Sequence, residues 1–211
     1  MTLEQKAKHI LEQLDILFPN AKGELDHENN FELLVAVVLS AQTTDVAVNI
    51  VTKDLFKYYP TPEKLANADI NHVMEILNRI GLYRNKSKNI INLSKILVEK
   101  YNGEVPNTRK ALESLPGVGR KTANVVLSIA FGIPAIAVDT HVARVSKRLG
   151  LVDEDDSVLK IEKKLMEIFP KEKWTKLHHQ LILYGRYHCT ARNNDPNRCV
   201  FREFCSYCSK I

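Results

Sequence analysis

The segment of this sequence whose residue types are best suited to chemistry ends in a lysine. Lys121 directly follows Leu115-Pro-Gly-Val-Gly-Arg120. A lysine amine is protonated in water and becomes a nucleophile only when burial or a cationic neighbour lowers its pKa. Arg120 and the positive end of the helix expected over residues 122–131 both disfavour a second positive charge at this place. Both neighbours would therefore favour the neutral form of the Lys121 amine.

The residues before Lys121 predict a tight turn between two helices. Residues 107–114 have the pattern of a short capped helix, and residues 122–131 that of an apolar helix. The two glycines of the turn allow positive φ and the close approach of another backbone. The amides of Val118, Gly119 and Arg120 are then expected to point outward at a helix N-terminus and to form an anion site.

This segment has two other interpretations. A phosphate-binding P-loop requires a glycine directly before its lysine, whereas Arg120 intervenes here and no buried strand precedes the turn. That interpretation is rejected. A structural turn between helices, with no ligand, stays open on this segment alone.

The four cysteines form the second chemical cluster. Cys189, Cys199, Cys205 and Cys208 are separated by nine, five and two residues. In a reducing compartment, such clustering indicates a metal or a cluster rather than disulfides. A [4Fe–4S] cluster needs four cysteine thiolates, and a structural zinc site also accepts four sulfurs. All four cysteines are candidate ligands for a [4Fe–4S] cluster, with structural zinc or no metal as the alternatives.

The elements that position these residues are predicted to be helices. Apolar residues recur at helical spacing in 31–39, 142–149, 158–168 and 177–184, and no convincing period-2 strand is present. The chain is therefore expected to be all-α. Periodicity stops after Tyr187, so the cysteine segment has almost no core of its own.

Composition sets the class of protein. The 211 residues are 45% hydrophobic, which is enough to bury a core. Lys and Arg outnumber Asp and Glu by 30 to 25, a net charge of +5 that suits a phosphate backbone without establishing one. The N-terminal residues are interrupted by charges, and no segment is apolar enough to span a membrane. We expect a monomer in the cytoplasm, associated with the nucleoid if the source is bacterial.

Several ordered motifs resemble the helix-hairpin-helix DNA glycosylases, and among them the endonuclease III family. They lie between about Phe18 and Tyr187 and are Leu39-Ser-Ala-Gln-Thr-Thr-Asp45, Ile80-Gly-Leu-Tyr83, Leu115-Pro-Gly-Val-Gly-Arg-Lys-Thr-Ala123, Ala137-Val-Asp-Thr-His141 and His178-His179 through Gly185-Arg-Tyr187. The resemblance implies a two-lobed all-α glycosylase fold. Residues 22–132 would form a six-helix barrel lobe with the hairpin. Residues 1–21 and 133–211 would form a second lobe that ends in the cysteine loop, 189–208.

The resemblance also implies the chemistry. Lys121 would attack the sugar C1′ of a damaged nucleotide, and Asp139 would stabilise the cationic sugar or accept the lysine proton. The resulting iminium ion would allow β-elimination, so the enzyme would be a DNA glycosylase and an AP lyase. Its partner would be duplex DNA that contains oxidised or ring-fragmented pyrimidines or abasic sites. From the residues alone, Asp139 is equally suited to be a helix N-cap, and the two roles are compatible.

Further DNA contacts follow from the same resemblance. A base inside a duplex has to be flipped out before it can react, and Gln42 and Leu82 would occupy the vacated space. Their alternatives are a helix-terminal polar residue and a buried leucine. The basic run 84–88 would contact phosphates or form a solvated face. The remaining contacts would come from Gly117, Val118, Gly119, Arg120 and His141.

The cysteine segment departs from the family pattern. The family has C-x6-C-x2-C-x5-C, and each of two alignments to this chain retains three ligands of the four. Two rival functions remain open. An adenine-removing glycosylase of the same superfamily is disfavoured by Lys121 and by the lack of a large C-terminal recognition domain. A non-catalytic DNA-binding module is disfavoured by the presence of both Lys121 and Asp139.

Overall fold

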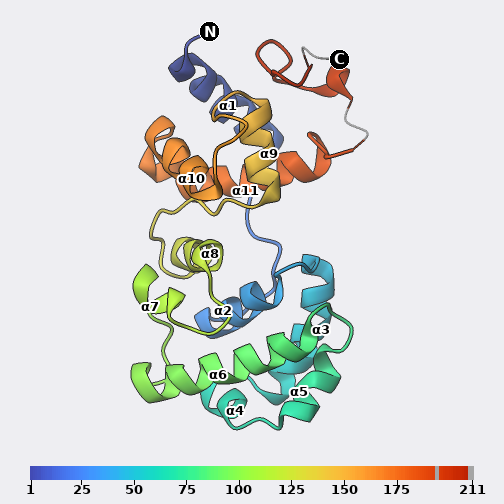
Figure 1. The fold of residues 1–211 in the computed structure, drawn as a ribbon, viewed down its shortest axis with the longest axis vertical. Helices are drawn as coiled ribbons and strands as arrows, with labels where there is room; N and C mark the ends of the chain where they lie inside the picture. Colours follow the sequence, from blue (N-terminus) through green and yellow to red (C-terminus); the bar gives the residue numbers. More distant parts are fainter. Residues whose placement is uncertain (193–194, 209–211) are drawn as a thin grey trace. The chain divides into compact units, whose positions relative to one another are not determined.

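The structure is a computed structural model that describes residues 1–192 and 195–208. Over these residues it consists of eleven α-helices and two 3-10 helices without a strand, so the predicted all-α class is confirmed (Figure 1). The chain divides into two compact units, residues 1–23 with 134–211 and residues 24–133. Within the described ranges, no helix is both long and apolar enough to cross a membrane.

The unit formed by residues 24–133 contains seven helices, where the resemblance implied a six-helix barrel over residues 22–132. They are α2 (Asn30–Leu39), α3 (Asp45–Tyr58), α4 (Pro62–Ala66), α5 (Ile70–Leu77), α6 (Tyr83–Tyr101), α7 (Arg109–Glu113) and α8 (Arg120–Ala130). Helices α4 and α7 have five residues each, too few to show a clear apolar period. Each still begins at a threonine whose side chain accepts a backbone N–H, as N-caps do.

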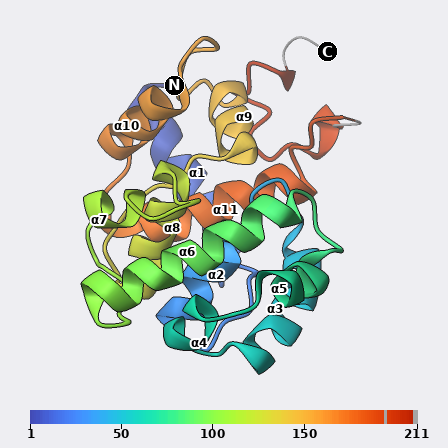
Figure 2. The ribbon, with the colours of Figure 1, turned by 60° about the horizontal axis from the view of Figure 1, so that its bottom comes forward.

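Helix α2 is the centre of this unit. Every residue from Phe31 to Leu39 is buried, which is expected of a helix that is apolar on all sides. The one charged residue in that stretch, Glu32, accepts a hydrogen bond from the Glu28 N–H at 2.7 Å. Helix α6 packs against α2, α4 and α5 (Figure 2). Its buried residues extend from Lys86 in the first turn to Leu97.

The other unit packs α1 (Leu3–Leu17), α9 (Thr140–Arg148), α10 (Val158–Ile168) and α11 (Trp174–Tyr187) around its own core. One short 3-10 helix, Lys171–Lys173, precedes α11, and another, Pro196–Arg198, follows it. The cysteine segment joins this core through Phe201, which is fully buried against the rings of Tyr184 and Phe204. A segment without periodicity is thus anchored by aromatic side chains, since Phe204 also contacts the His9 ring and the Arg148 guanidinium lies 3.8 Å from the centre of the Tyr207 ring.

Candidate functional site

The turn between α7 and α8 requires its first glycine. Gly117 has φ +79°, in the left-handed region. A Cβ at this position would lie 3.0 Å from both Val38 Cγ1 and Asn89 Nδ2, which belong to α2 and α6. Glycine therefore satisfies two conditions here, a backbone conformation that other residues rarely adopt and a close approach to neighbouring helices.

The amides of this turn differ from the expectation at one position. The Val118 N–H donates to the Leu115 carbonyl at 3.1 Å, and the Val118 side chain is buried. The prediction that this amide points outward as an anion ligand is wrong, because the amide closes the turn. Gly119 is the exposed N-cap of α8, and its N–H has no acceptor among the described residues. A Cβ added to Gly119 would meet nothing within 4 Å.

Lys121 lies in the first turn of α8, immediately after the hairpin. Its side chain is exposed, so an approaching ligand has access to the amine. The start of α8 is anchored in the core by Ala123, which follows Lys121 by two residues and is fully buried.

Asp139 is the N-cap of α9, as one interpretation of the sequence predicted. Its Oδ1 accepts hydrogen bonds from the N–H groups of His141 and Val142, at 2.8 and 2.9 Å. These bonds fix the orientation of the carboxylate, and Oδ2 has no partner among the described residues. The cap therefore leaves one carboxylate oxygen available. Asp139 belongs to the unit of residues 134–211, whereas Lys121 belongs to the unit of residues 24–133.

His141 sits in a close contact between α9 and α11. A Cβ at Gly185 would lie 2.8 Å from His141 Cβ, so glycine is needed for this approach. Arg144 Nη2 donates to His141 Nδ1 at 3.1 Å and to the Gly185 carbonyl at 2.8 Å. Because Nδ1 is an acceptor, neutral His141 carries its proton on Nε2.

Gln42 and Leu82 share an unusual backbone. Both have positive φ, 54° and 59°, and among the described non-glycine residues only Asn102 joins them. Leu82 precedes α6 and is 57% exposed, so the alternative of an ordinary buried leucine is wrong. Gln42 is exposed between α2 and α3. Strained, exposed residues of this kind cluster at functional sites.

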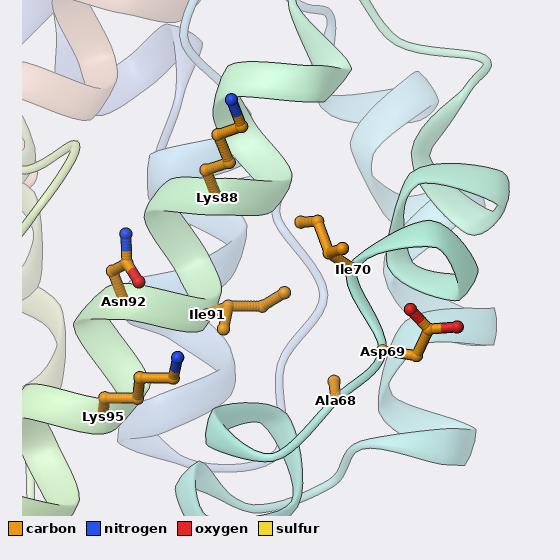
Figure 3. Close-up of a pocket in the computed structure, with 7 residues that line it drawn as sticks. All are labelled: Ala68, Asp69, Ile70, Lys88, Ile91, Asn92 and Lys95. Carbon is orange, nitrogen blue, oxygen red and sulfur yellow. The ribbon is translucent and has the colours of Figure 1, made fainter.

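The basic run of residues 84–88 does not form a single face. Arg84 and Lys88 are exposed, whereas Lys86 is only 4% exposed. Lys88 lines a surface pocket of about 420 Å³ together with Asn92 and Lys95 of the same helix (Figure 3). The sequence pattern of a basic run did not predict that Lys86 is buried. Helical spacing could have predicted it, because Lys86 and the buried Ile90 are four residues apart and lie on the same face of α6.

The structure brings three of the four cysteines together. The sulfur atoms of Cys199, Cys205 and Cys208 all lie within 4.8 Å of one another. Cys189 is buried outside this group, and its sulfur accepts a hydrogen bond from Arg148 Nη1 at 3.2 Å. The expected set of four ligands is therefore present as three neighbouring thiols and one separate thiol.

The surroundings favour a thiolate at Cys199, whereas the hydrogen bond with Cys199 raises the pKa of Cys205 and burial raises the pKa of Cys208. Hydrogen bonding by Cys205, and then by the Tyr184 hydroxyl, lowers the pKa of Cys199 to about 5. Arg148 supplies a positive charge beside Cys189. Sulfur donors with such neighbours fit a thiolate-bound iron–sulfur cluster, and they fit zinc as well.

Comparisons with known proteins show what the chain is similar to. Residues 35–171 match the HhH-GPD superfamily of base excision DNA repair proteins. The chain is 55% identical to endonuclease III of Bacillus subtilis over 195 residues, which cover 92% of this chain and 89% of that protein. It is 46% identical to endonuclease III of Escherichia coli K12 over 206 residues, 98% of this chain and 97% of that protein.

A solved structure agrees with these relatives. The chain superposes with a TM-score of 0.96 and 53% identity on a trapped covalent intermediate of an endonuclease III with DNA. The match covers 100% of this chain and 99% of that one.

Proposed function

Because the chain belongs to the endonuclease III family of base excision DNA glycosylases and AP lyases, we propose that Lys121 and Asp139 carry out its two reactions. The observation on which the proposal rests is the place of Lys121, an exposed amine in the first turn of α8 directly after the glycine turn. A phosphate bound at the turn would bring a nucleotide to this amine.

The lysine reaction begins with a neutral amine. Since Lys121 is exposed in the protein alone, the bound DNA has to supply the desolvation that favours this form. The nitrogen lone pair forms a bond to C1′ while the bond between C1′ and the base breaks. The base leaves with that electron pair and is protonated. The nitrogen then loses one proton, the C1′–O4′ bond breaks with its electron pair going to O4′, which is protonated, and the nitrogen lone pair forms the iminium double bond between Lys121 and C1′.

The iminium ion then drives strand cleavage. It withdraws electrons from C2′, so a C2′ proton is lost and the C3′–O bond breaks. The 3′ phosphate leaves with the electron pair of that bond, and hydrolysis of the imine releases the enzyme.

Asp139 supports the first step through its available oxygen. Positive charge develops on the deoxyribose as the base leaves, and a carboxylate stabilises that charge. The two hydrogen bonds to Oδ1 fix the side chain, so Oδ2 needs no reorientation during the reaction. The carboxylate is also a suitable acceptor for the lysine proton.

We further propose that Gln42 and Leu82 fill the space that the flipped nucleotide leaves. Both are exposed, and their left-handed backbones project from the ends of neighbouring helices. The substrates would be oxidised or ring-fragmented pyrimidines and abasic sites in duplex DNA, bound by one copy of the chain. Contacts from the hairpin and from His141 would go to the DNA backbone, which carries no sequence information.

For the cysteine segment, we propose a [4Fe–4S] cluster bound by Cys189, Cys199, Cys205 and Cys208, with structural zinc as the alternative. The group would order the segment around its ligands. Anaerobically purified protein should be brown, with a broad visible absorbance. Colourless protein with about one zinc per chain would support the alternative.

Borohydride trapping tests the role of Lys121. Wild-type protein should form a covalent adduct with a duplex that contains an abasic site, and Lys121→Ala should form none. Lys110→Ala is the matched control, because Lys110 is an exposed lysine on the other helix of the hairpin. Full trapping by Lys121→Ala would refute the assignment.

A further inference from the structure

Lys86 is a buried lysine that the reaction does not use. It lies in the first turn of α6 with 4% of its surface exposed. Its ammonium group donates a hydrogen bond to Thr43 Oγ1 at 2.6 Å. No carboxylate lies within ion-pair distance of Lys86 among the described residues, and burial lowers its pKa. A buried charge with a neutral partner is unfavourable for stability, so its presence needs an explanation.

The hydrogen bond from Lys86 ends next to Gln42. Residues 40–43 form a turn that is closed by a bond from the Thr43 N–H to the Ser40 carbonyl at 3.1 Å. Gln42 occupies this turn with φ +54°. The Thr43 hydroxyl donates to the Ala41 carbonyl at 3.3 Å and accepts from Lys86. Lys86 therefore anchors the turn at Thr43, the residue that follows Gln42.

The backbone of the same residue contacts Leu82. The Lys86 N–H donates to the Leu82 carbonyl at 3.0 Å, and the Asn85 N–H donates to it at 3.1 Å. Leu82 has φ +59° and no side-chain cap. One residue thus bonds to both exposed segments, which are 40 positions apart in the sequence.

We propose that Lys86 is a positioning residue that fixes the 40–43 turn relative to Leu82, so that Gln42 and Leu82 enter the duplex together. This inference rests on the insertion role of these two side chains in the proposed function. Among the described residues, the bond from Lys86 to Thr43 is the one hydrogen bond that joins the turn of Gln42 to α6. Catalytic groups tolerate little displacement, because misplacement by about 1 Å reduces a rate by up to about 100-fold.

The test compares substrates that need insertion with one that does not. Lys86→Met removes the charge and its hydrogen bond and keeps most of the side-chain length. Thr43→Val removes the acceptor and keeps the lysine, so it tests the contact even if Lys86→Met does not fold. Lys95→Met is the matched control, an exposed lysine on the same helix. Each variant is assayed for base removal from duplex DNA and for cleavage of an abasic site in single-stranded DNA.

Lys86→Met and Thr43→Val should each lower the single-turnover rate on duplex by about tenfold or more. Cleavage of the single-stranded abasic site should stay within about twofold of wild type. The double variant should be no worse than either single variant, because both changes remove one contact. The melting temperature of Lys86→Met should be unchanged or higher, since a buried charge is removed, whereas a merely structural lysine would lower it.

Two outcomes separate this inference from the proposed function. Equal losses on duplex and single strand, or wild-type duplex rates in both variants while Gln42→Ala and Leu82→Ala are impaired, would overturn the role of Lys86 alone. Wild-type duplex rates in Gln42→Ala and Leu82→Ala would refute insertion itself, and the role of Lys86 with it.

Discussion

Gly117 and Gly119 are separated by one residue of the α7–α8 hairpin, yet alanine should act differently at each. At Gly117, alanine has to adopt φ +79° and its Cβ would lie 3.0 Å from Val38 Cγ1 and Asn89 Nδ2. Left-handed strain costs about 1–2 kcal/mol, and an added methyl in a packed site costs about 1–3 kcal/mol. Lower entropy of the unfolded chain offsets about 0.4–1 kcal/mol of this.

Gly117→Ala should therefore lose about 2–3 kcal/mol of unfolding free energy. For a chain of this size, that loss corresponds to a melting temperature lower by about 5–10 °C. Gly119→Ala should stay within about 1 kcal/mol of wild type, because its φ is −97° and its Cβ would be in open space.

DNA binding, unlike stability, should be sensitive to alanine at Gly119. The Gly119→Ala methyl would occupy the space through which a phosphate reaches the Gly119 N–H. Loss of one hydrogen bond to a charged group weakens binding by about tenfold or more. Duplex affinity is measured by fluorescence anisotropy at fixed salt, because phosphate contacts are strongly salt-dependent.

Gly132→Ala is a control that separates strain from contact. Gly132 has φ +62°, but a Cβ there would meet nothing within 4 Å. It should lose about 1–2 kcal/mol from backbone strain and keep its DNA affinity. A Gly117→Ala protein that melts like wild type would refute the packing argument. Wild-type affinity in Gly119→Ala would refute the phosphate contact.

Three further predictions concern the unit of residues 134–211. Asp139→Asn should retain the N-cap and stay within about 0.5 kcal/mol of wild type, while base removal in single-turnover assays falls by about 100-fold; Asp139→Ala should also lose about 1 kcal/mol of stability. Burial lowers the pKa of His179 to about 4, below its unfolded value of 6.5, so the unfolded state binds its proton first. Stability should be complete above pH 6.5 and fall by about 3 kcal/mol as the pH drops to 4, and urea titrations should show a smaller fall in His179→Gln. Phe201→Ala should cost about 3–5 kcal/mol and reduce bound metal, measured by elemental analysis, whereas unchanged metal content would show that the cysteine segment does not depend on this anchor.

Local sequence signals predicted much of the helical framework. Thr61 before Pro62 and Ser157 before an apolar stripe are local cap signals, and each side chain accepts a backbone N–H of the helix that follows. These signals are reliable because a cap depends on a few consecutive residues. The hairpin before Lys121 was predictable for the same reason. The role of Lys121 itself followed from family motifs and stays a prediction.

Other features were decided by contacts between distant segments. Lys86 and Lys88 are similar in the sequence, but packing of α6 directs one toward Thr43 and the other to the surface. Contrary to expectation, the Val118 N–H is not available to bind an anion, because it donates to the Leu115 carbonyl within the turn. Residue types and helical period are properties of the chain itself. Which side chain is buried, and which N–H is left for a ligand, depends on neighbours that only folding brings together.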